Sequence, residues 1–428
     1  MKVALLGTGF GRAHAAEYAV RPDVDEVVVF GRTPEKLAEI ADQFGYATTT
    51  DLAAVLADPS VDLVDVCLPT RLHADVAVRA MEAGRDVFIE LPLAATLADA
   101  ERIVAAQRAT GRWAFVDMFG RFSPANQRLR EAVADRRYGD LEALEIERRT
   151  ALLWPGYLLG LETVALDMMH SDLDLVTGLL GHPSTVHVVG TGGPGGRGAA
   201  AEVLLGYPEA VARCSSSSLM PTSYGVRGGW RATFTTAVLE YAMRAGFTGH
   251  GPATLTEHTA TGRQTLDVPA ASPYAAAIDH VLACLAGRAN TLVDPATALP
   301  ALELTLDVHR RLTPAARWLY PARTAGDEPW ACRGPSAGER GGPRRIAPSG
   351  PSSYVRVDQS RGSCGRPPSA GRPEDVSSRV ASAAAWPSAS RRCSSSTCAG
   401  SSMGRKKPRM ARRAPPTWFI RLGTGAPP

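Results

Sequence analysis

Three glycines near the start of the chain are the first residues whose type and spacing could support chemistry. Gly7, Gly9 and Gly11 follow a short apolar run from Lys2 to Leu6, and an alanine-rich segment with helical character comes after them. Glycines between a strand and a helix let a phosphate group approach the amides at the helix N-terminus. Gly11 stands one residue before the third glycine of the usual GxGxxG pattern. We still expect this turn to bind the pyrophosphate of a dinucleotide, through Gly7, Gly9, Phe10 and Gly11.

A basic residue follows the second expected strand, Glu26 to Phe30, where dinucleotide-binding proteins commonly have an acidic one. An acidic residue would bind the ribose 2′-hydroxyl. Arg32 can instead make a bidentate contact with a 2′-phosphate, and Thr33 offers a hydroxyl. The sequence therefore favours NADP(H), with NAD(H) possible, and the alternative is that Arg32 is a solvated surface residue.

Two further strand-like segments, Val61 to Leu68 and Asp86 to Glu90, end in residues that should also face the cofactor. Ligands of open parallel sheets bind at the carboxyl ends of the strands. We expect the cofactor-binding residues there to be Leu68, Pro69, Thr70, His73, Glu90 and Leu91. His14 and His73 should shape the cofactor site rather than perform chemistry.

A stretch of titratable side chains in the second half of the chain could move protons. It runs Asp167-Met168-Met169-His170-Ser171-Asp172-Leu173-Asp174 and has helical character. Neutral imidazole titrates near working pH, so His170 could donate a proton to a ketone or accept one from a hydroxyl, supported by Asp167. Ser171 could position a substrate hydroxyl. The alternative is a structural His170 that pairs with a nearby carboxylate.

The length of 428 residues predicts two or three domains. We predict a nucleotide-binding domain over residues 1–122 and a second α/β domain over residues 123–322. Residues 323–428 are rich in Ser, Pro, Gly and Arg, and we expect a basic, disordered tail or the product of a frameshift. The strand-like runs of the second domain are Leu141 to Glu147, Thr185 to Val189, Ala201 to Leu205, Arg231 to Leu239 and Ala242 to Phe247.

The composition favours a globular protein without a membrane segment or metal. Hydrophobic residues make up 45% and charged residues 21% of the chain, and the apolar start is too short for a membrane span and lacks a signal cleavage site. We expect a cytoplasmic location. Cys67, Cys214 and Cys284 are far apart, which indicates neither zinc nor disulfides. Nucleic-acid binding by the basic tail is disfavoured against simple solvation.

Three segments, GTGFGRAHA, VDVCLPTRLHADVAVRAMEAGRDVFIELPLA and LDMMHSDLDLVTGLLG, resemble the glucose-fructose oxidoreductase, inositol dehydrogenase and MocA family. The resemblance runs from Met1 to about Leu319. It implies a doubly wound Rossmann domain followed by an α/β domain with a large, mostly antiparallel sheet that often mediates homo-oligomers. It also implies hydride transfer between NAD(P)(H) and a hydroxyl or keto carbon of a sugar, cyclitol or related polyol.

The chain departs from the family pattern at two catalytic positions. The family's Glu-Lys-Pro places a lysine beside the nicotinamide, but this chain has Leu91, and losing a positioned acid or base typically costs about 10²- to 10⁴-fold. With Asp167 and Asp174 anchored, the family's histidine falls on Ser171, and a shift of one residue turns a helical side chain by about 100°.

These departures leave two alternatives to simple hydride transfer open. One is a catalytically impaired, sensor-like nucleotide-binding protein, and the other is transient oxidation that supports elimination or epimerisation. Substrate specificity should come from the surroundings of Trp154, Tyr157 and the stretch Met220 to Trp230.

Overall fold

A computed structural model describes residues 1–151, 159–245, 252–269 and 271–313. These residues all fall in one compact unit of the chain that includes Met1–Pro321. The predicted tail, residues 323–428, and the candidate specificity residues Trp154 and Tyr157 lie outside the described residues.

The first sheet has six parallel strands in the order β3-β2-β1-β4-β5-β6. Apolar runs form its central strands, and four of the five residues of β1 and all four of β4 are buried because helices cover both faces. This confirms the predicted doubly wound sheet. The strands are β1 (Lys2–Leu6), β2 (Glu26–Phe30), β3 (Ala47–Thr49), β4 (Leu63–Val66), β5 (Asp86–Ile89) and β6 (Ala114–Val116).

Residues typical of helix ends mark the start of α5 and both ends of α2. Proline occupies the first turn of α2, and Gly45 ends it with a φ of 73°. Thr96 caps α5 by accepting a hydrogen bond from the Asp99 amide. The helices are α1 (Gly11–Tyr18), α2 (Pro34–Phe44), α3 (Leu52–Ala57), α4 (His73–Glu82) and α5 (Leu97–Thr110), with short 3₁₀ turns at η1 (Thr70–Leu72) and η2 (Phe119–Phe122). Among the helices described, none is both long and apolar enough to span a membrane.

The second sheet has eight strands in the order β14-β13-β12-β11-β7-β10-β9-β8, and only the pair β7 and β10 is parallel. This confirms a large, mostly antiparallel sheet. Its strands are β7 (Leu141–Ala151), β8 (Thr185–Gly192), β9 (Ala199–Gly206), β10 (Val211–Met220), β11 (Val226–Phe234), β12 (Ala237–Ala245), β13 (Ala253–Thr259) and β14 (Gly262–Leu266).

The expected continuous strand from Arg231 to Leu239 is wrong. A turn at Thr235 and Thr236 divides this stretch between β11 and β12, and the Thr236 hydroxyl donates to the Tyr138 carbonyl. The turn contains neither glycine nor proline, so the sequence carried no breaker signal there.

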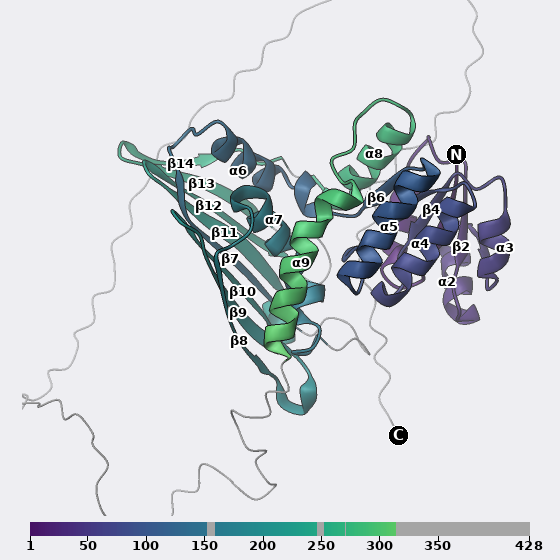
Figure 1. Cartoon of the computed structure of the whole chain (residues 1–428), viewed down its shortest axis with the longest axis horizontal. Helices are drawn as coiled ribbons and strands as arrows, with labels where there is room; N and C mark the ends of the chain where they lie inside the picture. The colour runs from purple at the N-terminus through teal and green to yellow at the C-terminus, as the bar shows by residue number, and fades with distance from the viewer. Residues whose placement is uncertain (152–158, 246–251, 270, 314–428) are drawn as a thin grey trace, which may run out of the picture. The chain divides into compact units, whose positions relative to one another are not determined.

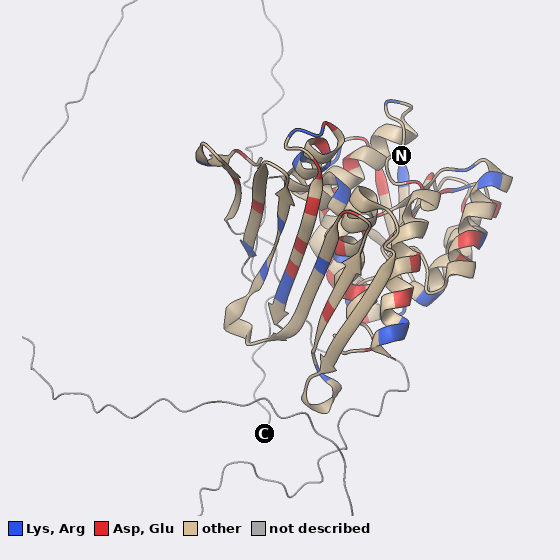
Figure 2. Ribbon diagram, turned by 60° about the vertical axis from the view of Figure 1, so that its left-hand side comes forward, with Lys and Arg blue, Asp and Glu red and all other residues tan. Residues whose placement is uncertain are grey.

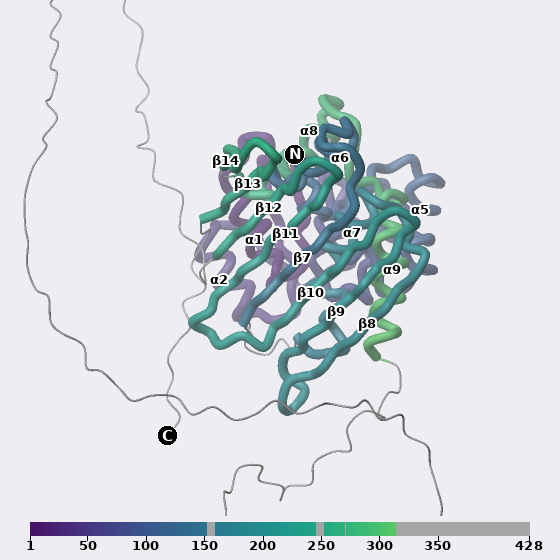
Figure 3. Tube along the Cα trace, turned by 90° about the vertical axis from the view of Figure 1, so that its left-hand side faces the viewer, coloured from purple at the N-terminus to yellow at the C-terminus, as the bar shows by residue number. Residues whose placement is uncertain are grey.

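Helices cover one face of the second sheet (Figure 1): α6 (Pro124–Ala134), α7 (His170–Leu180) and α9 (Pro295–Leu312). Figure 3 looks onto the other face, where no described helix lies in front of the strands. Charged residues of both signs are distributed along the strands of this sheet (Figure 2). Arg231 pairs with Glu145 and Glu240 across three neighbouring strands, at 2.8 and 2.7 Å.

Helix α9 connects two hydrophobic cores. Its Leu302 packs in the core of the parallel sheet together with Ile278 and Val281 of α8 (Pro273–Leu285). Its Val308 packs in the core beneath the second sheet. Residues from the end of the described chain thus complete the core of the N-terminal domain.

Candidate functional site

The turn after β1 has the geometry that a bound pyrophosphate requires. Gly7 has a φ of +127°, and a Cβ atom there would lie 2.3 Å from the Cys67 carbonyl oxygen. A Cβ on Gly9 would meet nothing within 4 Å, so open space adjoins this backbone. A Cβ on Gly11 would lie 3.3 Å from Cys67 Cβ, which explains why α1 can approach β4 closely. The turn therefore fits a dinucleotide, although its third glycine is displaced by one residue.

The end of β2 presents Arg32 and Thr33 to solvent. Both residues are exposed, and the described residues provide no ion pair or hydrogen bond for the Arg32 side chain. Thr33 stands at the N-cap of α2, yet its hydroxyl makes no capping hydrogen bond. Both side chains are thus available to a ligand at the edge where the ribose of a dinucleotide would lie.

A buried histidine connects the two loops that follow β4 and β5. His73 lies with Nε2 2.7 Å from the Leu68 carbonyl oxygen and Nδ1 3.0 Å from that of Pro92. Burial lowers its pKa, so the neutral ring can donate only one of these hydrogen bonds at a time. The structure brings the predicted residues Leu68, Pro69, Thr70, His73, Glu90 and Leu91 to one edge of the sheet, and His73 holds that edge together.

Leu91 occupies the position where the family has its lysine. Its side chain is half-buried and packs against the core of the parallel sheet, and its peptide bond to Pro92 is cis. The Leu91 amide donates to Glu90 Oε2 at 2.9 Å. The position thus offers an apolar surface directly beside the carboxyl of the preceding residue.

Behind Glu90 lies a cluster of buried polar groups that sequence reasoning missed. The His14 ring has Asp65 Oδ2 2.8 Å from Nδ1, and Glu90 Oε1 and Asp117 Oδ2 3.4 and 3.3 Å from Nε2. The Tyr18 hydroxyl donates to the same Asp65 oxygen at 2.7 Å. Asp65, His14 and Asp117 are at most 1% exposed, whereas the Glu90 side chain is 11% exposed.

Burial and charge raise the pKa values of three groups in this cluster, though for different reasons. Burial alone would lower the pKa of His14, but the carboxylates around it, Asp65 foremost, raise it well above its usual value. Burial, helped by Asp117, raises the pKa of Glu90 to about 7. Burial also raises the pKa of Asp117. The cluster therefore holds an imidazolium beside the Glu90 carboxyl, whose pKa lies near neutral pH.

The segment that contains Asp167, His170 and Ser171 includes a π-helical turn, η3 (Ala165–Met169), directly before α7. Such a turn holds one residue more than an α-helical turn, which changes the register of the helix that it precedes. His170 is 1% exposed, and its Nδ1 lies 2.8 Å from Thr305 Oγ1 of α9. Burial lowers the pKa of His170 to about 4, so its imidazole stays neutral at working pH.

Ser171 and Asp167 are less deeply buried than His170. Both are half-buried, and Ser171 lies beside Gly120, where a Cβ would approach within 3.9 Å. Arg148 of β7 reaches Ser171 Oγ at 3.5 Å and makes a 2.5 Å ion pair with Asp172. The Asp172 carboxylate raises the pKa of Arg148. A permanently charged guanidinium therefore stands beside the hydroxyl that occupies the family's histidine position.

Tyr274 at the start of α8 joins the two halves of the site and was also missed. Its ring stacks on Phe119 at 4.2 Å and approaches Phe10 of the glycine turn at 5.6 Å. Burial, together with the nearby Glu90 and Asp117, raises its pKa. The sequence signal was the pair Pro273-Tyr274 before a helix, which indicated only a structural element.

Two other side chains near the site, those of Arg121 and Trp230, join separate elements through hydrogen bonds. Arg121 makes a bidentate pair with Asp174 and also donates to Thr297 and to the Leu292 carbonyl, so it joins η2 to α7 and α9. Within the stretch Met220 to Trp230, Trp230 is buried and its indole donates to Asn126 at 2.9 Å.

The fold defines a class, the proteins that combine a Rossmann domain with a domain built on a large, mostly antiparallel sheet. Residues 1–118 match the model of the oxidoreductase family with an NAD-binding Rossmann fold. This match confirms, for residues 1–118, the resemblance to the glucose-fructose oxidoreductase, inositol dehydrogenase and MocA family found in the sequence.

Similar proteins extend this comparison. The 4-carboxy-2-hydroxymuconate-6-semialdehyde dehydrogenase of Sphingobium sp. is 38% identical over 129 residues, 30% of this chain and 41% of that protein. Inositol 2-dehydrogenase of Rhizobium meliloti is 31% identical over 186 residues, 42% and 55% of the two chains. The matched part thus spans about half or less of these relatives. The structure of UDP-N-acetylglucosamine 3-dehydrogenase of Acidithiobacillus ferrooxidans covers 74% of this chain and 98% of its own, with a TM-score of 0.61 at 25% identity.

Proposed function

We propose that this chain is an NAD(P)-dependent oxidoreductase that transfers a hydride between the cofactor and a hydroxyl or keto carbon of a sugar, cyclitol or related polyol. The observation that carries the proposal is the glycine turn, in which Gly7 packs on Cys67 while the backbone at Gly9 adjoins open space. Relatives named as dehydrogenases of inositol and of a nucleotide sugar support the substrate class.

NADP(H) is the favoured cofactor because Arg32 and Thr33 are exposed where an acidic residue would select NAD(H). The nicotinamide group, when bound, supplies or accepts the hydride. Gly7, Gly9, Phe10 and Gly11 would hold its pyrophosphate, and the loops joined by His73 would orient the nicotinamide end.

Asp167 and Ser171 are proposed to orient the reacting hydroxyl, with Arg148 fixing Ser171. The buried hydrogen bond to Thr305 favours the structural alternative for His170, with a threonine hydroxyl in place of the expected carboxylate partner. A neutral, enclosed imidazole contributes packing rather than proton transfer at neutral pH.

The second candidate function is nucleotide binding without turnover, and Leu91 is the observation that favours it. Titration with NADPH and NADH, followed by nicotinamide fluorescence and repeated with a panel of keto sugars and cyclic polyol ketones, separates the two. Cofactor consumption with any of these ketones supports the oxidoreductase. Binding without consumption supports the sensor, and absence of binding contradicts both.

A homo-oligomer formed through the open face of the second sheet is also proposed. The ion pairs of Arg231 with Glu145 and Glu240 lie on this face, and charged pairs on a flat sheet can set the register of an identical partner. Light scattering after size-exclusion chromatography tests it. Arg231→Glu should lower the molar mass to that of one chain, whereas Arg102→Glu on α5 should not.

A further inference from the structure

Three buried polar side chains, those of His14, Glu90 and Asp117, meet through long contacts of 3.4 and 3.3 Å at His14 Nε2. Within the described residues, no hydrogen bond reaches His14 Nε2, Glu90 Oε1 or either carboxylate oxygen of Asp117. Leaving such atoms without a well-formed hydrogen bond in a protein interior is costly, so an arrangement of this kind indicates a function. The groups come from α1 and from the ends of β5 and β6, which is the edge that binds ligands in this fold.

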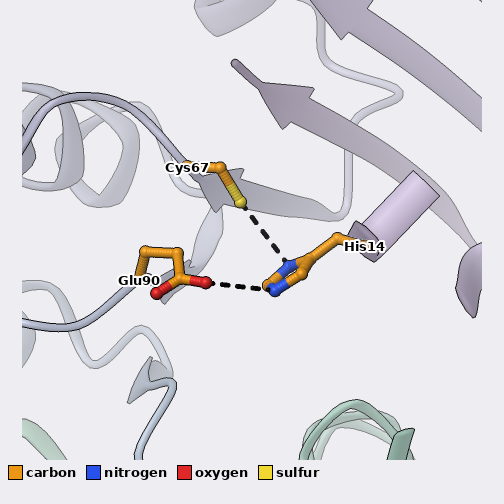
Figure 4. A group of neighbouring side chains, drawn as sticks. All are labelled: His14, Cys67 and Glu90. Carbon is orange, nitrogen blue, oxygen red and sulfur yellow. Dashed lines mark hydrogen bonds and ion pairs between the residues drawn. The ribbon is translucent and has the colours of Figure 1, made fainter. Parts of the chain in front are cut away.

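The geometry does not fit a metal ion. His14, Cys67 and Glu90 offer ligand atoms that all lie within 4.8 Å of one another. Figure 4 shows, however, that Cys67 Sγ faces Nδ1 at 3.6 Å while Glu90 faces Nε2 at 3.4 Å. One ion binds one nitrogen of an imidazole in the plane of the ring, so Cys67 and Glu90 cannot both join it there. Asp65 already occupies Nδ1.

The side chains of Asp65, His14 and Glu90 instead form a line that runs from the interior of the protein toward its surface. Asp65 orients the His14 ring through Nδ1, the ring presents Nε2 to Glu90, and exposure rises from 0% for the Asp65 side chain to 11% for that of Glu90. Glu90 directly precedes Leu91. The Glu90 carboxyl therefore connects the cluster to the position where the family has its lysine.

We propose that the Glu90 carboxyl donates the proton of the reaction to the substrate oxygen, or accepts it from there, in this chain. His14 positions this carboxyl and influences its charge, and Asp65 orients His14. The inference rests on the proposed oxidoreductase function. In the reducing direction the carbonyl carbon gains the hydride that the reduced cofactor supplies, and the π electron pair of the carbonyl moves to its oxygen. That oxygen takes the proton of the Glu90 carboxyl and leaves a carboxylate beside imidazolium. Oxidation of a hydroxyl runs the same steps backward.

The surroundings of Glu90 are suited to this role. Its pKa near 7 gives both protonation states at working pH. The titratable and charged groups that face it or its partners come from every element packed around it: His14 and Tyr18 of α1, Asp65 and Cys67 at β4, Asp117 at β6, Tyr274 of α8 and Arg148 of β7.

The test compares Glu90→Gln, which keeps the size of the side chain, with Glu82→Gln at the exposed end of α4 as the matched control. The pH dependence of kcat/KM should show an ionisation near pH 7 in the wild type and in Glu82→Gln. Glu90→Gln should lose this ionisation, and kcat should fall about 100-fold or more. Adding Leu91→Lys to Glu90→Gln should recover part of the rate, because the lysine brings a proton donor to the same place.

A second test, by infrared spectroscopy, follows the protonation of Glu90 without requiring turnover. Infrared spectra should show a protonated carboxyl band that titrates near pH 7 and disappears in Glu90→Gln. Asp117→Asn should move this titration to lower pH, because the Asp117 charge raises the pKa of Glu90. If Glu90→Gln turned over with the wild-type rate and pH profile, the inference about Glu90 would be wrong and the proposed function would stand. A wild type that consumes no cofactor with any ketone would instead contradict the proposed function.

Discussion

At the scale of single residues, the exchange of lysine for leucine at position 91 changes what the neighbouring carboxyl must do. A lysine would add a positive charge close to Glu90 and keep it ionised. With Leu91, His14 is the cationic side chain that pairs with Glu90 in the described structure, and Asp65 and Asp117 share it. The apolar side chain at 91 is therefore consistent with a Glu90 that holds a proton near neutral pH.

Arg32 should determine the choice between the two nicotinamide cofactors. Arg32→Ala removes a charge-assisted contact with the 2′-phosphate, so the Kd for NADPH should rise about 10- to 100-fold while the Kd for NADH stays within about twofold. Fluorescence titration measures both constants. Arg108→Ala, at the exposed end of α5, is the control, and an equal loss of affinity for both cofactors in Arg32→Ala would contradict this assignment.

His170 should matter for stability more than for turnover. His170→Ala removes a buried ring and its contact with Thr305, so we expect the free energy of unfolding to fall by about 2 kcal/mol. The pH dependence of kcat/KM should stay unchanged, since the wild-type ring is neutral above about pH 4. Denaturant titration and a pH series measure the two effects. Loss of an ionisation from the pH profile would restore His170 as the proton donor.

The residues of the site were predictable from sequence to different degrees. Gly7 and Gly9 follow from local rules, because a strand, a turn and a helix are consecutive in the chain. The cluster around His14 was not found, because Asp65, Glu90 and Asp117 come from three separate strands and meet only after the sheet has formed. One signal existed: Asp65 lies inside an apolar run whose neighbours are all buried.

At the scale of elements, the parallel strands follow from their apolar runs, and the observed bounds of β1 and β2 equal the predicted ones. The second sheet was harder to predict. Its turn at Thr235 and Thr236 depends on contacts with Tyr138 and Asp140 rather than on local conformational preference. The π-helical turn η3 likewise has no local sequence signature, yet it sets which side chains of α7 face the site.

The buried carboxyl groups that follow β5 and β6 should make the protein less stable as the pH rises. The pKa of Glu90 is about 7 in the folded chain against 4.5 for a free glutamate, so folding binds a proton that the unfolded chain has already lost. This contribution is complete below pH 4.5 and is lost as the pH rises through 7. The free energy of unfolding should fall by about 1 kcal/mol per pH unit within this window.

Denaturant titration at a series of pH values checks this slope. Glu90→Gln should show a shallower slope by about one proton, whereas Glu82→Gln should match the wild type. Asp117, whose pKa burial also raises, leaves part of the slope in place. Identical slopes in all three proteins would show that Glu90 carries no extra proton in the folded state.

At the scale of the whole described molecule, one group of ion pairs joins elements from distant parts of the chain. Asp174 of α7 lies 2.7 Å from Arg121 and 3.6 Å from Arg130, and Arg121 continues to Thr297 of α9. Asp174 is 6% exposed. Removing one partner of such a buried pair leaves an uncompensated charge.

Asp174→Asn should therefore lower the free energy of unfolding by about 3 kcal/mol. The comparison is Asp307→Asn, which breaks the more exposed pairs with Arg310 and Arg311 on α9 and should cost less than about 1 kcal/mol. Thermal and denaturant unfolding measure both variants. Equal losses in the two would mean that Asp174 is effectively solvated.

The place of β7 in the second sheet has a consequence for biosynthesis. It is the earliest strand of that sheet in the chain, yet it lies at the centre and pairs with β10 and β11. At a translation rate of about 5 to 20 residues per second, both edges of β7 stay unpaired for several seconds after it leaves the ribosome. Unpaired strand edges invite association with other chains. Nascent chains of this protein should therefore depend on chaperones until β11 has emerged and β7 can insert between its two neighbours.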